Sequence, residues 1–381
     1  MKKNVLLAPG PTPVPPEALM DMALPIIHHR EPEFKPIFEE CLEGLKYLFQ
    51  TERDVVILAS SGTGAMEAAV TSFLRTGDKA IFVNGGKFGE RWGKILKAYG
   101  CVPIEVKVEW GKAVDPAVIE KLLDEDPEIR AVYFQASETS TAVKHPAKEI
   151  AAITAKRPGV ICVADAITAT GVFDLPMDAW GLDIVVTGSQ KALMLPPGLG
   201  FIASSEKADA FLETANIPHY YFDIKLEKKK LADKQTAWTP AVSLIVGLRK
   251  VLAMIKEEGL ENVHKRTARF AKAAREGAKA IGLELFAPDS PSDALTAVKI
   301  PDGIDGLKVK KILRESYAVT VAGGQDEAKG KIVRLAHLGY AGTFDVITGL
   351  SALEMALADA GYEFEMGKGV AKAMEILREG A

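Results

Sequence analysis

One lysine and one aspartate stand where neighbouring strands of a sheet would bring them together. Lys191 follows the apolar run 183–187 in a short polar turn, and a Pro-Pro-Gly break follows at 196–198. Asp165 lies at the end of another apolar run, 160–166. From 165 to 191 the chain runs 26 residues, about one crossover between parallel strands, so both side chains are expected at one edge of a sheet.

A lysine that is partly buried can act as a nucleophile, because desolvation disfavours its ammonium form and leaves a neutral amine near neutral pH. An aldehyde-binding lysine and an aspartate that pairs with a pyridinium nitrogen are the two protein groups that pyridoxal phosphate requires. Taken alone, Lys191 is better explained as a surface lysine at the end of a strand. A hydrolase dyad of Ser189 and Lys191 is another alternative, but it leaves Asp165 unexplained.

A glycine-containing turn at 60–67, Ser-Ser-Gly-Thr-Gly-Ala-Met-Glu, lies between a predicted strand and a predicted helix. Exposed amides and the helix dipole at such a start suit a phosphate group. Two alternatives remain, a plain N-cap turn and a dinucleotide-binding loop. The second would need a third glycine where Glu67 stands.

Three further positions could contact a cofactor or a substrate. Phe88 opens a helix after Asn84-Gly85-Gly86 and could stack on a planar ring, or simply pack in the core. The hydroxyls of 137–141, Ser-Glu-Thr-Ser-Thr, could bind a phenolic oxygen or cap the next helix. Arg334 interrupts an apolar strand pattern and needs an anion, either a substrate carboxylate or an internal salt bridge.

The elements that must position these residues follow an alternating pattern. Seven apolar runs are separated mostly by amphipathic segments of helix length, which predicts an α/β fold with a mostly parallel seven-stranded sheet and helices on both faces. The predicted strands are 54–59, 79–84, 103–108, 131–137, 160–166, 183–187 and 200–204. Functional loops are expected at the carboxyl ends of these strands.

Three regions are predicted. Prolines at 9, 11, 13, 15 and 16 predict an extended N-terminal arm over 1–20. A large cofactor-binding domain is predicted over 21–255 and a smaller C-terminal α/β domain over 256–381, with the boundary inside a long helical pattern at 242–281 that breaks near Gly259. In the smaller domain we predict strands at 283–286, 296–300, 319–322 and 332–335, and helices at 306–315, 343–360 and 369–378.

Composition excludes several classes of function. A net charge of -4 without a domain-scale basic excess argues against nucleic-acid binding. No apolar run approaches the length of a membrane span or a secretory core. The three cysteines, Cys41, Cys101 and Cys162, are far apart and are interpreted as free thiols of a cytoplasmic protein. The six histidines, His28 and His29 among them, show no ligand spacing, so no metal site is expected.

In this order the motifs resemble the class V, fold-type I pyridoxal-phosphate aminotransferases of the alanine–glyoxylate and serine–pyruvate branch. The resemblance covers almost the whole chain. It is carried by the motifs at 9–12, 61–64, 138–141, 164–166, 188–193, 196–198 and 330–335. Ala142 replaces a glycine common in the family, and Phe88 stands where the branch often has tryptophan.

The resemblance implies roles around the cofactor ring. Lys191 would bind pyridoxal phosphate as a Schiff base and move the substrate proton, while Asp165 would keep the ring nitrogen protonated. Phe88 would stack on the ring, and Thr139 would bond its phenolic oxygen.

It also implies which groups hold the phosphate and the substrate. The phosphate would be held by Thr63, Gly64, Ala65 and Gln190, joined by Thr236 and Thr239 of the partner subunit in a homodimer. The substrate carboxylate would be held by Arg334, with Gly10 near the same pocket.

The resulting expectation is a homodimeric transaminase that moves an amino group from alanine or serine to glyoxylate or pyruvate by a ping-pong mechanism. Aspartate or a phosphonate-bearing amine is an alternative donor. A desulfurase-type lyase would need a cysteine in a mobile loop, and none of the three is so placed. A non-catalytic hydrogenase-associated subunit is the alternative from another class.

Overall fold

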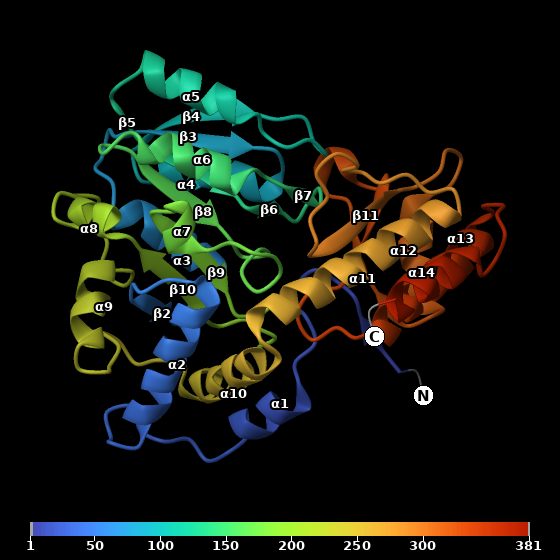
Figure 1. Ribbon diagram of the computed structural model, residues 1–381, viewed down its shortest axis with the longest axis horizontal. Helices are drawn as coiled ribbons and strands as arrows, with labels where there is room; N and C mark the ends of the chain where they lie inside the picture. Colours follow the sequence, from blue (N-terminus) through green and yellow to red (C-terminus); the bar gives the residue numbers. More distant parts are fainter. Residues whose placement is uncertain (1–2, 380–381) are drawn as a thin grey trace.

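The computed structural model describes residues 3–379 and contains a central seven-stranded sheet with helices in front of and behind it (Figure 1). The strand order is β2-β10-β9-β8-β5-β3-β4. The bounds are β2 (Val55–Leu58), β3 (Lys79–Asn84), β4 (Val102–Lys107), β5 (Ile129–Gln135), β8 (Ile161–Asp165), β9 (Ile184–Gly188) and β10 (Gly200–Ser204). All seven predicted strands are therefore confirmed. Only β10 runs antiparallel to its neighbours, β2 and β9.

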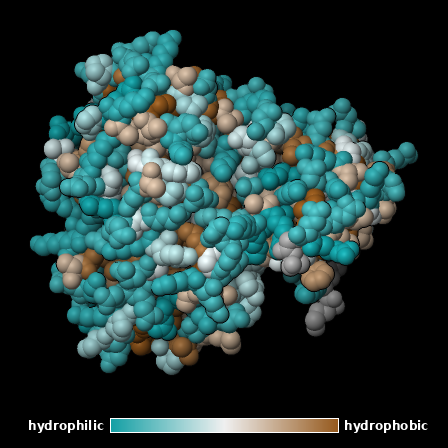
Figure 2. All heavy atoms as spheres, viewed as in Figure 1, coloured by the Kyte–Doolittle hydropathy of each residue, from teal (hydrophilic) through white to brown (hydrophobic). Residues whose placement is uncertain are grey.

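The sheet owes its place at the centre to strands that are apolar along their whole length. All residues of β8 and β9 are buried, as expected for parallel strands covered on both faces. Helix α3 (Gly62–Thr71) packs on β9 and β10, α4 (Lys87–Ala98) on β3 and β4, and α6 (Ala147–Ala155) on β8. The face in Figure 2 is mainly hydrophilic, with hydrophobic residues in small groups, because the apolar strands lie inside.

The remaining helices of this part of the chain surround the sheet. Their bounds are α1 (Pro16–Met22), α2 (Phe34–Phe49), α5 (Pro116–Glu125), α7 (Met177–Trp180), α8 (Glu206–Leu212), α9 (Ile224–Leu231) and α10 (Val242–Glu258). A short hairpin of β6 (Ser137–Glu138) and β7 (Val143–Lys144) follows β5. This hairpin places the hydroxyl-rich residues 137–141 beside the carboxyl edge of the sheet.

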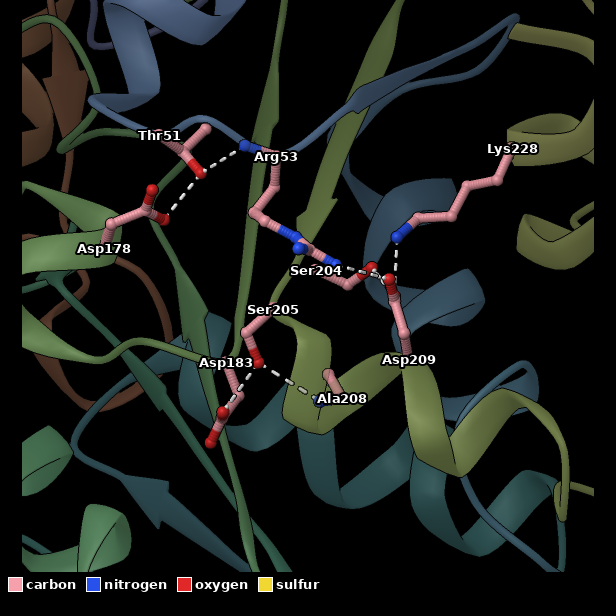
Figure 3. Close-up of polar contacts among 9 residues, drawn as sticks. All are labelled: Thr51, Arg53, Asp178, Asp183, Ser204, Ser205, Ala208, Asp209 and Lys228. Carbon is pink, nitrogen blue, oxygen red and sulfur yellow. Dashed lines mark hydrogen bonds and ion pairs between the residues drawn. The ribbon is translucent and has the colours of Figure 1, made fainter. Parts of the chain in front are cut away.

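Polar side chains fix the opposite edge of the sheet (Figure 3). Asp183, just before β9, accepts hydrogen bonds from the amide of Cys162 at 2.9 Å and the hydroxyl of Ser205 at 2.8 Å. Asp209 on α8 accepts from Ser204 at 2.6 Å and pairs with Lys228 on α9 at 2.5 Å. These contacts hold β8, β9 and β10 in register at the edge away from Asp165 and Lys191.

The smaller C-terminal part has its own hydrophobic cluster, which includes Phe270, Leu313 and Leu353. Its antiparallel sheet has the order β11-β14-β13. The elements are α11 (Leu260–Ala280), β11 (Leu295–Lys299), α12 (Gly306–Glu315), β12 (Val319–Thr320), β13 (Ala322–Gly323), η1 (Asp326–Ala328), β14 (Ile332–Ala336), α13 (Thr343–Ala360) and α14 (Lys368–Arg378). The predicted helices are confirmed, and so is the break at Gly259 between α10 and α11. The domain boundary near 255 stays a prediction.

Three predicted segments differ from the structure. The run 319–322 is not one strand, because β12 pairs with the N-terminal arm whereas β13 pairs with β14 in another sheet. The run 283–286 is no strand; it touches β11 only through an isolated bridge between Leu285 and Val298, since Pro288 and Pro291 follow at once and cannot donate to a ladder. The arm is not extended as far as residue 20, because α1 begins at Pro16. A proline at the first helical position loses no hydrogen bond.

The rest of the arm crosses from the smaller part to the sheet. Strand β1 (Val5–Leu6) pairs in parallel with β12. The amide of Thr12 then donates to the carbonyl of Gln190 at 3.2 Å, and its hydroxyl donates to the carbonyl of Lys191 at 2.9 Å. The arm therefore lies against the turn that carries the predicted nucleophile.

Candidate active site

Lys191 lies in the turn after β9 and is 8% exposed. Its amine donates to the carbonyl of Pro9. A side-chain carbon at Gly10 would overlap the Lys191 amine, and Gly10 has φ +133°, so only glycine fits at this point of the arm. The arm thus closes over the amine.

The environment of Lys191 leaves part of its amine neutral near physiological pH. Desolvation by burial lowers its pKa to about 8, with smaller lowering effects from Arg334 and Arg91. The negative charge of Asp165 acts in the opposite direction. The structure thus supports the buried interpretation of Lys191, and the surface alternative is wrong.

Asp165 is the last residue of β8 and is 4% exposed. One of its oxygens accepts from the amide of Ile167 at 2.9 Å. Its pKa is raised to about 7, mainly by burial and to a smaller extent by Glu138, while the Ile167 amide, Arg91 and Lys191 act in the lowering direction. Since β8 and β9 are adjacent and parallel, Asp165 and Lys191 share the carboxyl edge of the sheet, as the spacing predicted.

Arg334 points from β14 into the same region and is 5% exposed. It donates to the carbonyl of Thr139 at 2.6 Å, and to that of Gly323 at 3.0 and 2.7 Å. Burial lowers its pKa to about 10, against the raising effect of Glu138. Within residues 3–379 no carboxylate lies within ion-pairing distance of Arg334, so the internal salt bridge is the wrong interpretation. Two of its five N–H groups remain for an anion.

The turn at 60–67 opens α3 at Gly62, as predicted. The amides of Gly64 and Ala65 donate to the carbonyl of Ser61 at 2.9 and 3.4 Å. The hydroxyl of Thr63 accepts from Arg91 at 2.9 Å. Two of the expected phosphate donors therefore already have a backbone acceptor, and a third lies next to a cation.

Arg91 is a site residue that sequence reasoning missed. It lies on α4, its guanidinium sits 4.9 Å from the centre of the half-buried Phe88 ring, and it reaches Thr63. Its charge also acts on Asp165 and Lys191. The signal was present, because residues three apart on a helix share a face.

Two other predicted residues lie beside this group. The hydroxyl of Thr139 is 2.8 Å from that of Thr168, a second residue that the sequence did not indicate. Gln190 adjoins Lys191, and its side-chain oxygen is buried without a hydrogen-bond partner among the described residues. This unused atom is an acceptor, so it needs a donor and cannot itself bind an anion.

Among the described residues, no hydrogen bond joins the side chains of Thr236 and Thr239 to this group. The hydroxyl of Thr236 donates to the carbonyl of Trp238 at 2.5 Å, and Thr239 is exposed. Both line a small cavity with Tyr221 and Glu227 near the end of β2. Their expected contribution through a partner subunit stays a prediction.

Other chemistries have little support in this chain. Cys41, Cys101 and Cys162 are all buried, so none is placed in a mobile loop. Within residues 3–379, no group of His, Cys, Asp or Glu is arranged to hold a metal ion. In the same described range, no helix is both long enough and apolar enough to cross a membrane.

A buried lysine beside a buried aspartate, at the carboxyl edge of a mostly parallel sheet, defines a fold-type I pyridoxal-phosphate-dependent enzyme. The chain belongs to the class-V aminotransferases: a sequence model of that family, described as Aminotransferase class-V, matches residues 19–343. The family implies pyridoxal phosphate as the cofactor.

Similar proteins carry more than one kind of name. The chain is 41% identical to the soluble hydrogenase 42 kDa subunit of Anabaena cylindrica, over 98% of each chain. It is 37% identical to the L-aspartate–glyoxylate aminotransferase of Paracoccus denitrificans, over 99% of this chain and 97% of the other. Its structure resembles pyridoxamine–pyruvate aminotransferase of Mesorhizobium loti, with a TM-score of 0.94 and 29% identity over 100% of this chain and 98% of the other.

Proposed function

We propose that this chain is a homodimeric aminotransferase that transfers the amino group of alanine or serine to glyoxylate or pyruvate in two half-reactions of a ping-pong mechanism. The observation that carries the proposal is the convergence of three buried, charge-bearing groups, Lys191, Asp165 and Arg334, from three different strands or turns. Burying ionisable groups that do not neutralise one another lowers the stability of a fold. Such a group of residues therefore points to a ligand that compensates their charges.

The residues present fit pyridoxal phosphate. When bound, the cofactor supplies an electron-withdrawing ring that stabilises negative charge on the substrate α-carbon. Around the ring we assign Lys191 to the aldehyde carbon, Asp165 to the ring nitrogen, Phe88 to the ring face and Thr139 to the phenolic oxygen. At the phosphate we assign Thr63 and Gln190, with Gly64 and Ala65, whose amides also donate to the carbonyl of Ser61. The partner subunit's Thr236 and the partner subunit's Thr239 would complete this group.

Lys191 acts as the base and acid of the reaction. With a pKa of about 8, its Nζ would be partly neutral near pH 7 and could hold the proton removed from the substrate α-carbon. Asp165 has an unmet need for a cation, because burial raises its pKa to about 7. A protonated ring nitrogen meets that need and would keep this carboxyl ionised.

Arg334 binds the α-carboxylate of the amino acid through its two unused N–H groups. Pro9 and Gly10 lie against Lys191 from the arm, which keeps water from the reacting amine. Exclusion of water strengthens each of these charge interactions.

A donor with one carboxylate is favoured by the charges around the amine. The cations that act on Lys191 are Arg334 and Arg91, and Arg91 already donates to Thr63 on the phosphate side. One guanidinium is then left for the substrate. This supports alanine or serine over aspartate or a phosphonate-bearing amine, each of which brings a second anion.

Aspartate is the second candidate donor, on the strength of the Paracoccus relative. The name of the Anabaena relative raises the alternative of a non-catalytic hydrogenase subunit. A scaffold has no need for Lys191, Asp165 and Arg334 in one buried group, so we favour the enzyme. Three buried free thiols support a cytoplasmic location.

The test is a screen of single half-reactions. Purified protein loaded with pyridoxal phosphate is mixed with one amino acid at a time, and the cofactor absorbance is followed. Alanine or serine should convert the cofactor fastest, and glyoxylate or pyruvate should restore it. Lys191→Ala should abolish both changes, whereas Lys228→Ala, at a lysine paired with Asp209 far from the site, should not. No conversion by any amino acid, or co-purification with stoichiometric partner proteins, would favour the scaffold.

A further inference from the structure

Helix α4 is capped by side chains from another part of the chain. The amide of Lys87 donates to the hydroxyl of Ser140 at 3.0 Å. The amides of Phe88 and Gly89 donate to one carboxylate oxygen of Glu138, at 3.1 and 2.9 Å. These are the first-turn amides that an N-cap residue normally satisfies.

The helix has no capping side chain of its own because its N-cap is Gly86. A side-chain carbon at Gly86 would overlap the Ser140 hydroxyl and lie 2.6 Å from the γ-carbon of Glu138. The space that a local cap would fill is thus occupied by Glu138 and Ser140. The hydroxyl-rich loop therefore caps an earlier helix, not the next one as the sequence alternative had it.

Glu138 uses both carboxylate oxygens in this arrangement. Its second oxygen accepts from the amide of Ser140 at 3.0 Å and from its hydroxyl at 2.5 Å. The side chain is 0% exposed, and within the described residues no cation lies within ion-pairing distance of it. Four donors and the positive end of the α4 dipole favour the charged form, against burial, which raises the pKa of Glu138.

The capping contacts connect three parts of the candidate site. Phe88 and Arg91 lie on the first turns of α4. Thr139 follows Glu138 directly, and its carbonyl accepts from Arg334 at 2.6 Å. Moving Glu138 would therefore shift the aromatic ring, the Thr139 hydroxyl and the arginine together.

We propose that Glu138 is a positioning residue of the active site, which fixes Phe88 on α4 relative to Thr139 and Arg334 and so sets the affinity for both the cofactor and the substrate carboxylate. The cofactor part of this inference rests on the proposed function. A plain structural cap would hold α4 together without affecting either affinity.

The chain contains a matched control. Glu354 on α13 is 1% exposed and caps α14, whose N-cap is also a glycine, Gly367. It accepts from the amides of Gly367 and, at 2.9 Å, Val370. Its contacts lie in the C-terminal helices, and it touches none of the residues assigned to the site.

The experiment compares Glu138→Gln with Glu354→Gln in the full chain. Each glutamine keeps the size of the side chain but turns one acceptor oxygen into a donor, so both variants should melt at a lower temperature. Only Glu138→Gln should raise the dissociation constant for pyridoxal phosphate and the KM for the amino acid, each roughly tenfold or more, because small displacements of positioned groups have effects of this size. Equal losses of melting temperature with unchanged affinities in both would overturn the proposal.

Two further measurements keep the proposal testable. If Glu138→Gln does not fold, Ser140→Ala removes the cap on Lys87 and one donor to Glu138, and should weaken cofactor binding to a smaller degree; an unchanged affinity would refute the idea. If the wild-type chain binds no pyridoxal phosphate, the proposed function fails and the cofactor part fails with it. Hydrogen exchange then tests the positioning role without the cofactor. Glu138→Gln should accelerate exchange around Thr139 and Arg334 as well as over 86–92, whereas a plain cap would affect 86–92 alone.

Discussion

Gly10 lies directly against the amine of Lys191, and the neighbouring Pro9 carbonyl accepts a hydrogen bond from that amine across 182 residues of sequence. The contact exists because the arm pairs with β12 through β1 and then crosses to the turn after β9. The nucleophile is therefore enclosed by the N-terminal arm as well as by the sheet.

Gly10→Ala should remove this arrangement. The new methyl group would overlap the Lys191 amine, and φ of +133° would strain it at a cost of about 1–3 kcal/mol. We expect a lower melting temperature together with loss of covalent cofactor attachment, measured as the fraction of protein trapped by borohydride reduction.

Gly303→Ala separates strain from contact. Gly303 has φ +80°, but no atom lies within 4 Å of the added carbon. The Gly303→Ala variant should therefore be less stable and still attach the cofactor. If Gly10→Ala also keeps full attachment, the arm does not constrain Lys191.

In the cofactor-free protein, Asp165→Asn should increase the stability of the fold, and the increase should depend on pH. Burial raises the pKa of Asp165 to about 7, so between pH 4 and 7 the folded state retains a proton that the unfolded state has released. The free energy of unfolding of the wild-type chain therefore falls as pH rises through this window, whereas that of Asp165→Asn does not. The gain should be on the order of 1–3 kcal/mol above pH 7 and vanish near pH 4, measured by urea unfolding.

Asp183→Asn is the matched comparison, since Asp183 is also buried but receives three donors, from Cys162, Ser205 and Lys207. This variant should lose stability at neutral pH. A stabilisation at Asp183, or none at Asp165, would contradict the assignment of Asp165 as a carboxylate awaiting a cation.

Arg334→Lys should impair recognition of the substrate carboxylate. A lysine cannot keep the bonds to Gly323 and Thr139 while binding a carboxylate in two-pronged fashion. We expect KM for the amino acid to rise on the order of 100-fold, with the cofactor spectrum retained, since loss of one partner of a buried charged pair costs about 2–5 kcal/mol.

Arg275→Lys provides the control because Arg275 is partly buried and pairs with Asp293 at 2.9 Å. Its KM should stay unchanged. An amine that lacks a carboxylate should react equally with wild type and Arg334→Lys; if the variant is equally impaired for that amine, Arg334 has another role.

Local sequence patterns predicted most of the helices and strands. Apolar, β-branched runs predicted all seven strands of the sheet, and amphipathic periods predicted α12 and α13 at their observed bounds. The errors at 283–286 and 319–322 lie where strand pairing decides. The error at the end of the arm has another cause, because a proline begins helix α1 there. A short apolar run becomes a strand only if a neighbour accepts its backbone bonds over its whole length.

The sequence by itself determined which chemical groups the site contains, because Lys191, Asp165 and Arg334 stand at strand ends or interrupt apolar patterns in ways that local rules can recognise. Only the tertiary structure decided how these groups are held. The cap of α4 by Glu138, the reach of Arg91 to Thr63 and the closure of Gly10 over Lys191 join residues that are far apart in sequence. Such contacts depend on how whole helices and strands pack together, and the spacing of residues along the sequence does not predict that packing.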